Sequence, residues 1–430
     1  MSERLRIGIA GLGTVGRGVV RLFGEHGELL ARRCGRPIAI TAVSARERSR
    51  DRGIDVSGYV WHEDAAALAV ADDVDVVVEL IGGEDGIARA VVERAIGAGK
   101  HVVTANKALL AHHGTKLATA AEDAGVALAF EAAVAGGIPI VKAMREGLSA
   151  NRFRRVYGIL NGTCNYILTH MQESGRDFEA VLAEAQALGY AEADPAFDVD
   201  GIDAAHKLAI LTSLAYGMPL NFDAIYIEGI RGVEASDIIF AEELGYRIKL
   251  LAIARLTDNG IEQRVHPCMV PADTPIAGVN GVFNAVVAEG DFVDRTVYEG
   301  RGAGEGPTAS AVVADILDIA RGNRVPTFSV PARELQPIPV APMDRHMGPY
   351  YVRLTVLDQP GVIADISAIF RDHEISIESL LQRGRAPAEA VPVVMTMHDT
   401  VEAAMVNALR RIAELPAVLA SPKMIRIEML

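Results

Sequence analysis

The sequence contains few cysteines and no long apolar run, and each shortage excludes a class of protein. Its three cysteines, Cys34, Cys164 and Cys268, form neither a CxxC pair nor a disulfide framework, which is typical of a reducing compartment. No apolar stretch approaches the length of a membrane span, and no charged and apolar leader precedes the first strand pattern. We therefore expect a cytoplasmic protein without a membrane partner.

Positive charge is also scarce relative to negative charge. The chain has 42 lysines and arginines against 56 aspartates and glutamates, a net charge of −14. Nucleic acids and anionic membranes bind basic surfaces, so neither is expected as the main partner. Half of the 430 residues are hydrophobic, and a chain of this length is expected to form two or three domains, each with its own core.

A glycine-rich turn follows the first predicted strand, at residues 5–10. It reads GLGTVG and leads into a helical pattern. Gly11 permits a tight turn, Gly13 lets the backbone approach a pyrophosphate, and Gly16 lets the helix pack closely on the strand. Because the motif stands between a strand and a helix, it predicts a Rossmann-type dinucleotide-binding domain rather than a plain glycine turn.

The next predicted strand, at 38–43, ends in the sequence SARERSR. Enzymes that bind NAD usually place an acidic residue at this strand end, where it binds the ribose. A hydroxyl and three arginines follow here instead, which favours a 2′-phosphate and hence NADP(H) over NAD(H), with Arg46 among the contacts. The alternative is a solvated basic loop.

Further apolar runs predict strands at 75–81, 101–104 and 126–130, with a helix at 87–98 between the first two. Lys107 comes just after the strand at 101–104, at the edge where parallel sheets bind ligands. An exposed lysine at a helix start is the alternative interpretation of this position.

The strand at 126–130 leads into EAAVAGGIP at 131–139, which is too irregular for a helix and too apolar for an exposed loop. Its one acid, Glu131, together with nearby free carbonyls, is able to bind a hard cation. The residues alone leave this open.

The stretch at 188–211 concentrates acidic residues ahead of one lysine. Asp200 or Gly201 suits the N-cap of a helix that then carries Asp203 and Lys207 on one face. A surface ion pair is the ordinary interpretation of such a spacing. Adjacent apolar residues indicate a docked helix instead, in which carboxylates keep Lys207 charged, and a charged lysine can donate a proton to a carbonyl that accepts hydride.

The middle of the chain, at 131–325, predicts an α+β catalytic and dimerisation domain. The expected strands are 154–160, 261–270 and 284–288, and the expected helices are 167–172, 178–188 and 241–254. A glycine-rich loop at 298–307 precedes a strong helix at 308–321, which is expected to return to the nucleotide-binding domain at 1–130. The proline-rich residues 326–348 are expected to form a linker, and 349–430 a small βαββαβ domain without a catalytic cluster.

Four motifs together resemble the homoserine dehydrogenase family in its monofunctional form, with a C-terminal ACT domain. They are GLGTVG at 11–16, TANKALLA at 104–111, GILNGTCNYIL at 158–168 and LGYAEADPAFDVDGIDAAHKLAIL at 188–211. The first motif is common to many dehydrogenases, whereas the last two are long and specific. No aspartate kinase domain precedes the glycine motif, and DQPGVIADIS at 358–367 resembles the first turn and helix of an ACT domain.

The resemblance implies the reversible NAD(P)-dependent interconversion of L-homoserine and L-aspartate 4-semialdehyde, a step towards threonine, methionine and isoleucine. By match to the family motifs, Lys207 donates the proton and Lys107 lies beside nicotinamide and substrate. Glu192 and Asp203 hold the amino acid, and Asp198 supports the lysine.

The resemblance also implies a set of ligand contacts. The cofactor-binding residues it implies are Gly11, Gly13, Thr14, Val15, Gly16, Arg46, Thr104, Lys107, Gly189, Glu192 and Gly306. A monovalent cation, usually Na⁺, is implied at Glu131 with the carbonyls of Val134, Gly136 and Ile138. L-threonine is implied as an effector of the ACT domain, and a homodimer or homotetramer as the assembly.

Three alternatives remain at this point. An aspartate-semialdehyde dehydrogenase would need a cysteine nucleophile, and Cys164, which stands where the family has threonine, would have to serve. A nucleotide-sensing regulator would bind NADP(H) and an amino acid without turnover. In the third alternative, the ACT-like domain binds no ligand and only mediates assembly. This remains open because a fold does not specify its ligand.

Overall fold

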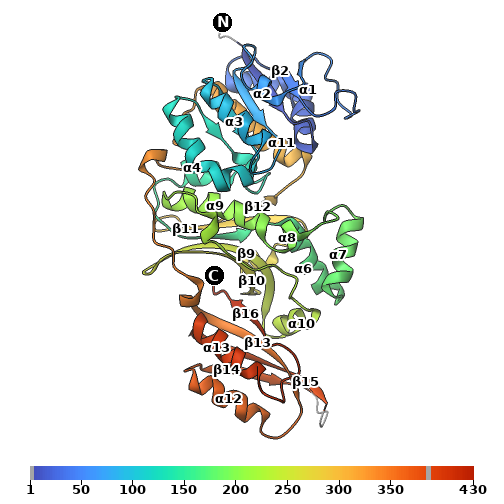
Figure 1. The fold of residues 1–430 in the computed structure, drawn as a ribbon, viewed down its shortest axis with the longest axis vertical. Helices are drawn as coiled ribbons and strands as arrows, with labels where there is room; N and C mark the ends of the chain where they lie inside the picture. The colour runs from blue at the N-terminus through green and yellow to red at the C-terminus, as the bar shows by residue number, and fades with distance from the viewer. Residues whose placement is uncertain (1–3, 384–388) are drawn as a thin grey trace.

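The computed structural model describes residues 4–383 and 389–430. The chain forms three parts stacked along the long axis, with the N-terminus at one end and the C-terminal helices at the other (Figure 1). The C-terminus itself returns to the middle of the molecule, so the last strand lies beside the central part.

The first part is a parallel sheet. Within the described residues it contains six strands in the order β3-β2-β1-β4-β5-β6, the arrangement of a Rossmann-type fold. Its strands are β1 Leu5–Ala10, β2 Ile38–Ser44, β3 Val60–His62, β4 Val76–Glu79, β5 His101–Thr104 and β6 Leu128–Ala129. Its helices are α1 Thr14–Cys34, α2 Ala65–Leu68, α3 Ile87–Gly97, α4 Lys107–Asp123 and α11 Glu305–Arg321. The expected α/β fold with a dinucleotide-binding sheet is confirmed.

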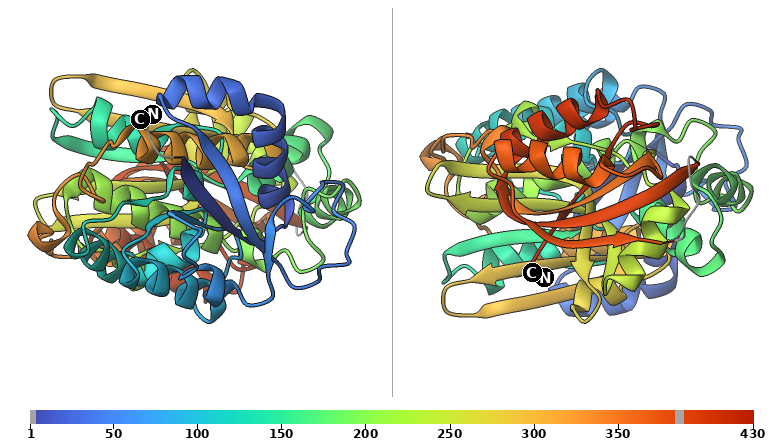
Figure 2. Two further views of the ribbon diagram at one scale, coloured as in Figure 1. Left: turned by 90° about the horizontal axis from the view of Figure 1, so that it is seen from above. Right: turned by 90° about the horizontal axis from the view of Figure 1, so that it is seen from below.

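Helix α11 belongs to this part although it comes late in the sequence (Figure 1; Figure 2, left). It packs against α1, and its buried residues Ala309, Val312 and Ile316 join one core cluster with Ile7 and Ile9 of β1. The helix begins at Glu305, three residues earlier than expected, directly after the glycine-rich loop. That loop is therefore held between the nucleotide-binding sheet and the second sheet.

The second sheet runs through the rest of the molecule. Within the described residues its order is β12-β11-β7-β9-β10-β16-β13-β15-β14, with β8 paired to β10. Its strands are β7 Phe153–Ile159, β8 Tyr226–Ile227, β9 Tyr246–Thr257, β10 Gly260–Pro271, β11 Phe283–Gly290, β12 Asp294–Arg301, β13 Met347–Leu357, β14 Ile377–Gln382, β15 Ala390–Val401 and β16 Lys423–Ile427. The helices beside it are α5 Ile140–Lys142, α6 Gly162–Ser174, α7 Phe178–Ala187, α8 Ala196–Val199, α9 Ile202–Tyr216, α10 Ala235–Glu243, α12 Val362–Asp372 and α13 Glu402–Ala413.

The expected helix at 241–254 is wrong. Helix α10 ends at Glu243, and the strand β9 begins at Tyr246. Alternate residues of this strand enter different cores, since Leu250 and Ala252 belong to one cluster and Leu251 and Ile253 to another. A strand buried on both faces has a continuous apolar sequence instead of an alternating one, and such a run is not distinguishable from a buried helix by periodicity.

Two further segments differ from expectation. The strand β12 occupies the first residues of the expected loop at 298–307 and lies at the sheet edge. The expected linker is docked on the protein: Phe328 is fully buried and its ring centroid lies 5.3 Å from that of Phe130. The Glu122 carboxylate at the end of α4 accepts backbone N–H groups of Thr327 and Ala332. The proline-rich stretch is therefore a packed connection.

The C-terminal part continues the second sheet. Its βαββαβ order is confirmed, and α12 and α13 cover one face of its strands (Figure 2, right). The last strand, β16, pairs in parallel with β10 through Cys268 opposite Arg426. Ion pairs of Arg264 with Glu428, and of Arg426 with Glu228, cross this junction. Among the described residues, no helix is long and apolar enough to cross a membrane.

Candidate active site

A cavity of about 610 Å³ lies between the nucleotide-binding sheet and the second sheet. The first part contributes Thr14 and Val15 at the start of α1 and Lys107 at the start of α4. The second part contributes Asp203 and Lys207, which lie on α9. Chemistry-bearing residues from distant parts of the sequence therefore face one space.

Helix α9 positions the central pair. Of the two expected N-caps the structure uses Gly201, whose φ of 87° is left-handed and which has little room for a side chain beside Val265. One turn later Asp203 and Lys207 lie on the same face, and Lys207 Nζ is 2.7 Å from Asp203 Oδ2. Both side chains are largely buried, with 7% and 10% of their surfaces exposed. The surface ion pair considered as the alternative is excluded.

The Lys207 ammonium is held by two acceptors. Besides Asp203, it donates to the backbone carbonyl of Leu160 at 2.6 Å. An ammonium has three N–H donors, so one remains for a ligand in the cavity that Lys207 lines. Lys207 is therefore oriented by two acceptors and able to donate one further hydrogen bond.

Asp203 joins the two lysines. Its Oδ1 lies 3.3 Å from Lys107 Nζ, while its Oδ2 accepts from Lys207. Burial by itself raises the pKa of Asp203, but the two ammonium groups and their hydrogen bonds outweigh it and lower that pKa to about 2. The carboxylate is therefore ionised at any physiological pH and fixes the positions of both lysines.

Asn161 is a site residue that the sequence reasoning missed. Its Nδ2 donates to Asp198 Oδ1 at 2.7 Å and to Asp203 Oδ2 at 2.8 Å, while its Oδ1 caps α6 by accepting from the Cys164 backbone. An asparagine followed by glycine at a strand end is a recognisable helix cap. The cap was visible in the sequence, whereas the bridge between two carboxylates was not.

Asp198 reaches Lys207 only through this bridge. Burial and the neighbouring Asp203 carboxylate raise the pKa of Asp198, and hydrogen bonds from Asn161 and Thr163 only partly oppose them. The direct partner of Lys207 is thus Asp203, and Asp198 supports it one hydrogen bond further away. A buried carboxylate with a raised pKa gains stability when a cationic group binds beside it.

Cys164 does not have the properties of a nucleophile. It is fully buried, its Sγ donates to the Asp198 carbonyl at 3.2 Å, and burial raises the pKa of its thiol well above the usual value. A reactive cysteine needs an accessible thiolate. This argues against the cysteine-dependent alternative.

The glycine turn forms a second cavity of about 550 Å³, lined by Gly11, Gly13, Thr14 and Arg46. Gly11 has a φ of 107°, and a Cβ there would lie 2.5 Å from the Leu80 carbonyl. Space is open around the Cα of Gly13, and α1 begins without a side-chain cap. Free N–H groups at a helix start beside open space fit a pyrophosphate, so the residues present suit a dinucleotide.

Of the remaining residues expected to bind the cofactor, some line a cavity and others do not. Gly189 lines the larger cavity, whereas Glu192 and Gly306 lie outside the linings of both cavities. The Thr104 hydroxyl is buried and donates to Glu79 at 2.6 Å. Gly16 lies close to the Gly11 carbonyl and so lets α1 approach the turn.

Glu131 is buried behind the larger cavity. Its two carboxylate oxygens accept the backbone N–H groups of Val141 and Lys142, each at 2.9 Å. Burial and the nearby Asp315 carboxylate raise the pKa of Glu131 to about 7. The turn that follows bends sharply, since Ala135 and Gly136 both have positive φ. Val134, Gly136 and Ile138 in this turn are buried, and the Ile138 carbonyl accepts the backbone N–H of Ile140. A buried carboxylate beside an irregular turn with backbone carbonyls has the chemistry of a cation site.

The glycine turn suits the pyrophosphate of a dinucleotide, and the Lys107 and Lys207 ammonium groups share the Asp203 carboxylate at one cavity. Together these features define a dehydrogenase, an oxidoreductase that uses a dinucleotide. Comparison with known proteins specifies it further. Residues 139–317 match the family described as homoserine dehydrogenase, 11–131 its NAD-binding domain, and 350–414 the ACT domain. A homoserine dehydrogenase of Pseudomonas aeruginosa is 47% identical over 433 residues, covering 99% of each chain. The chain belongs to the homoserine dehydrogenase family.

Solved structures agree. A homoserine dehydrogenase from Thiobacillus denitrificans is 45% identical with a TM-score of 0.94, covering 99% of both chains. A more distant structure, a hyperthermophilic archaeal homoserine dehydrogenase described as a complex with NADPH, is 25% identical with a TM-score of 0.65. It covers 75% of this chain and all of its own.

Proposed function

We propose that the chain interconverts L-homoserine and L-aspartate 4-semialdehyde, with Lys207 as the proton donor in the reduction direction. The observation that carries this proposal is the buried Lys207 ammonium, which has two of its donors engaged by Asp203 and Leu160 while its side chain lines the cavity. The third donor is free for the oxygen of an aldehyde.

The chain's residues divide the chemistry among them. A bound nicotinamide supplies the hydride donor for reduction or the acceptor for oxidation. In reduction, negative charge develops on the carbonyl oxygen, and the Lys207 ammonium stabilises that charge and transfers a proton to the oxygen. The Lys107 ammonium places a second positive charge beside Asp203, the carboxylate that also holds Lys207. In the oxidation direction, neutral Lys207 accepts the hydroxyl proton.

The amino group of the substrate is bound by carboxylates. Asp203 already holds both lysines, so we assign the substrate ammonium to Asp198, whose raised pKa a cation would relieve, with Glu192 as the second candidate. Glu192 is exposed and outside the cavity linings. For Glu192 to take this role, the segment between α7 and α8 would have to move towards the cavity.

The first experiment is an assay of L-homoserine oxidation with NADP⁺ and with NAD⁺, followed at the absorbance of the reduced nicotinamide. Turnover with either cofactor supports the proposal. Complete lack of turnover with both, in a preparation that binds the cofactor, would contradict it.

We infer that NADP(H) is preferred. Arg46, Arg50 and Arg52 line the cavity at the glycine turn together with three acids, Asp51, Glu63 and Asp64. Asp51 accepts the backbone N–H of Gly53, and Asp64 that of Ala66. Arg52 donates to the carbonyls of Glu47 and Arg50, so we assign the anion to Arg46 and Arg50. The archaeal relative described with NADPH supports this preference.

A variant and a matched control test the preference for NADP(H). Arg46→Ala is expected to raise KM for NADP⁺ about tenfold, because a charged hydrogen bond is lost, and to leave KM for NAD⁺ nearly unchanged. Arg48→Ala is the control, since Arg48 lies over the Trp61 ring and does not line the cavity. Equal effects of the two variants would argue against a phosphate contact at Arg46.

We propose a monovalent cation, Na⁺, at Glu131 with the carbonyls of Val134, Gly136 and Ile138. Among the described residues Glu131 makes no ion pair within 4 Å, although it is 2% exposed. A cation would compensate this burial. The test is the dependence of turnover and of melting temperature on Na⁺ at constant ionic strength, with Glu131→Gln as the variant that should lose the dependence.

We propose further that L-threonine regulates the enzyme through the ACT domain. Its first turn places Gly361 with a φ of 98° at the N-cap of α12, and β16 pairs with β10 of the central sheet. A continuous sheet therefore connects the ACT domain to the central part of the molecule, and a structural change at this turn is able to propagate along it. Turnover that falls as L-threonine rises would support this role, whereas indifference to threonine would restrict the domain to assembly or another effector.

A homodimer is the assembly that we propose. Strand β12 lies at the edge of the second sheet with every residue at least partly exposed, and the neighbouring Phe292 is 90% exposed. An exposed edge strand beside an apolar side chain pairs readily with another chain. Light scattering of Phe292→Asp, compared with the wild type, tests whether this edge holds two protomers together.

A further inference from the structure

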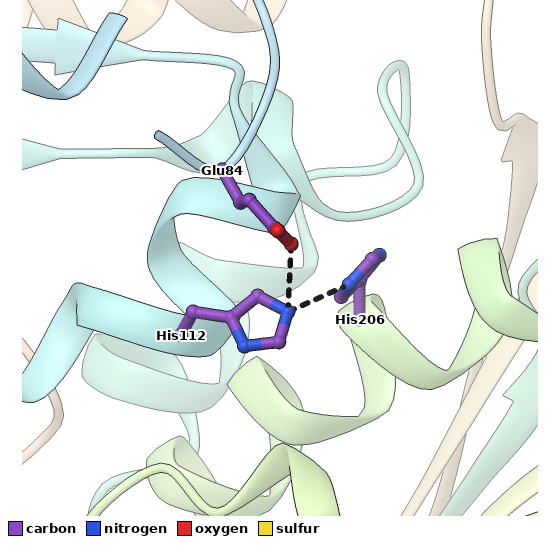
Figure 3. Close-up of side chains that lie close together, drawn as sticks. All are labelled: Glu84, His112 and His206. Carbon is purple, nitrogen blue, oxygen red and sulfur yellow. Dashed lines mark hydrogen bonds and ion pairs between the residues drawn. The ribbon is translucent and has the colours of Figure 1, made fainter. Parts of the chain in front are cut away.

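Three side chains with metal-binding atoms meet where the nucleotide-binding part touches α9 (Figure 3). Glu84 comes from the loop after β4, His112 from α4 and His206 from α9. His112 Nε2 lies 3.2 Å from Glu84 Oε2 and 3.4 Å from His206 Nε2. None of the three lines the substrate cavity, so the cluster is separate from the site described above.

The separations between these atoms fit one tetrahedral ion. Zinc binds imidazole nitrogen and carboxylate oxygen at about 2.0–2.2 Å. At a tetrahedral angle, two ligand atoms at that distance from one ion lie roughly 3.3–3.6 Å apart. The observed 3.2 and 3.4 Å are close to this edge length. The third separation, between Glu84 and His206, lies within 4.8 Å, so an ion would bind with Glu84, the exposed member of that pair, adjusting towards His206.

Aromatic packing fixes the two rings. The His206 ring stacks on Phe222 with centroids 4.5 Å apart, and the His112 ring lies 4.8 Å from the same phenyl ring. His206 is 3% exposed, and among the described residues its Nδ1 has no hydrogen-bond partner, so Nε2 is the ring nitrogen that is engaged. Imidazoles that are already held in place lose little entropy when they bind an ion.

A second cluster serves as an internal contrast. His266, Cys268 and Glu428 also have their ligating atoms close together, and all three are buried. There Glu428 is already ion-paired with Arg264, whose guanidinium also contacts His266. A fixed positive charge at these groups opposes a second cation, and the second cluster is explained without a metal.

We propose that Glu84, His112 and His206 bind a divalent transition-metal ion of the zinc class, with water in the fourth position. The ion would join α4 to α9. Lys107 begins α4 and Lys207 follows His206 directly on α9. Occupancy would therefore restrain the distance between the two helices that carry the active-site lysines, and would stabilise the contact between the two parts of the molecule.

Cobalt(II) is the probe for this site, because tetrahedral Co²⁺ absorbs visible light more strongly than octahedral Co²⁺ does. Full-length protein freed of metal with a chelator is titrated with Co²⁺ and then with Zn²⁺. We expect a visible band that saturates at one equivalent and disappears when Zn²⁺ displaces cobalt. Zn²⁺ should also raise the melting temperature.

Variants locate the ion. Glu84→Gln and His112→Gln are each expected to weaken Co²⁺ binding at least about tenfold, since even indirect support of a ligand is worth that much. His113→Gln is the matched control: His113 is the next residue on α4 but pairs with Asp85, and this variant should bind as the wild type does. Glu84 is exposed, so Glu84→Gln is expected to fold normally, which circular dichroism checks.

The proposal is overturned if no saturable band forms, or if Glu84→Gln and His112→Gln bind Co²⁺ with wild-type affinity. A thiolate-to-cobalt charge-transfer band in the near ultraviolet would also overturn it, because it would place the ion at Cys268 in the other cluster. Loss of binding in both variants with retention in His113→Gln would support it.

Discussion

Two buried lysines of this protein have opposite environments. Lys207, at the wall of the substrate cavity, lies against the Asp203 carboxylate. Lys249, inside the second sheet, donates instead to the Val279 carbonyl at 2.6 Å and to Asn280 Oδ1 at 3.1 Å. Burial and the nearby Arg247 lower the pKa of Lys249 to about 8. The two ammonium groups are similarly buried, but only that of Lys207 has a carboxylate beside it to compensate its charge.

The contrast explains why only one of the two suits proton transfer. The Asp203 carboxylate compensates the charge of the Lys207 ammonium and orients it, and the cavity leaves space for a substrate beside it. Carbonyl groups alone satisfy the hydrogen bonds of Lys249 without compensating its charge. Four substitutions test this contrast, in order of their expected effect on turnover.

Replacing the proton donor should have the largest effect. Lys207→Ala is expected to lower kcat roughly a thousandfold, within the range of general acid–base catalysis, because the variant lacks the ammonium that we assign to the carbonyl oxygen. Binding of NADPH, measured by fluorescence titration of the same preparation, should change by less than about twofold, a difference of less than 0.5 kcal/mol. Equal losses in kcat and in cofactor affinity would indicate a structural role.

Removing the carboxylate should have the next largest effect. Asp203→Asn is expected to lower kcat about a hundredfold, since both lysines lose their common anchor. Breaking a buried pair should also cost about 3 kcal/mol of unfolding free energy. Denaturant titration measures the loss, and the isosteric Asp198→Asn, which leaves the ion pairs in place, should lose much less.

This carboxylate also gives stability a definite pH dependence. The pKa of Asp203 is about 2 in the folded state, below the usual 3.8. The stabilisation is therefore complete above pH 3.8 and is lost as the pH falls towards 2. Asp203→Asn lacks this group, so the stability difference between wild type and variant should shrink over that interval. A difference that stays constant would show that the ion pair contributes nothing.

Removing the bridging amide should have a moderate effect. Asn161→Ala deletes the hydrogen bonds to Asp198 and Asp203 and the cap of α6. We expect about a tenfold lower kcat and about 1 kcal/mol lower stability from the lost cap. Asn161→Ser keeps a capping group and should recover the stability without recovering kcat. Recovery of both by serine would mean that Asn161 acts only as a cap.

Replacing the second buried lysine should leave turnover nearly unchanged. Lys249→Met removes an ammonium whose folded pKa, about 8, lies below its usual 10.5. Below pH 8 folding must bury this group in its charged form, at a cost. The cost is relieved as the pH rises from 8 to 10.5, because the unfolded chain then binds more protons than the folded chain does. Relative to Lys249→Met, the wild type should gain roughly 3 kcal/mol over this interval.

The sequence predicted the parts of this arrangement that depend on local pattern. Five of the six parallel strands, the glycine turn and the spacing of Asp203 and Lys207 follow from periodicity and short motifs, whereas the three-residue strand β3 was not predicted. Strand β9 was not predictable in this way, because it is buried on both faces and so has no alternation. The edge strand β12 was missed because both of its faces are polar or half exposed.

Contacts between segments that are distant in the chain were not predictable from the sequence. Lys107 on α4 approaches Asp203 on α9 from the nucleotide-binding part, and Asn161 joins two carboxylates about forty residues further along the chain. The same is true of Glu84, His112 and His206, which come from three separate elements. Side chains far apart in the chain meet only through the packing of the two sheets, and one sequence does not specify that packing in enough detail.

The most direct test of the central claim is the rate of hydride transfer in a single turnover. Wild-type protein and Lys207→Ala, each with NADPH already bound, are mixed with L-aspartate 4-semialdehyde, and the nicotinamide absorbance is followed by stopped flow. If Lys207 supplies the proton, the single-turnover rate falls about as much as kcat does, roughly a thousandfold. A rate equal to that of the wild type would show that the proton comes from elsewhere and would contradict the account.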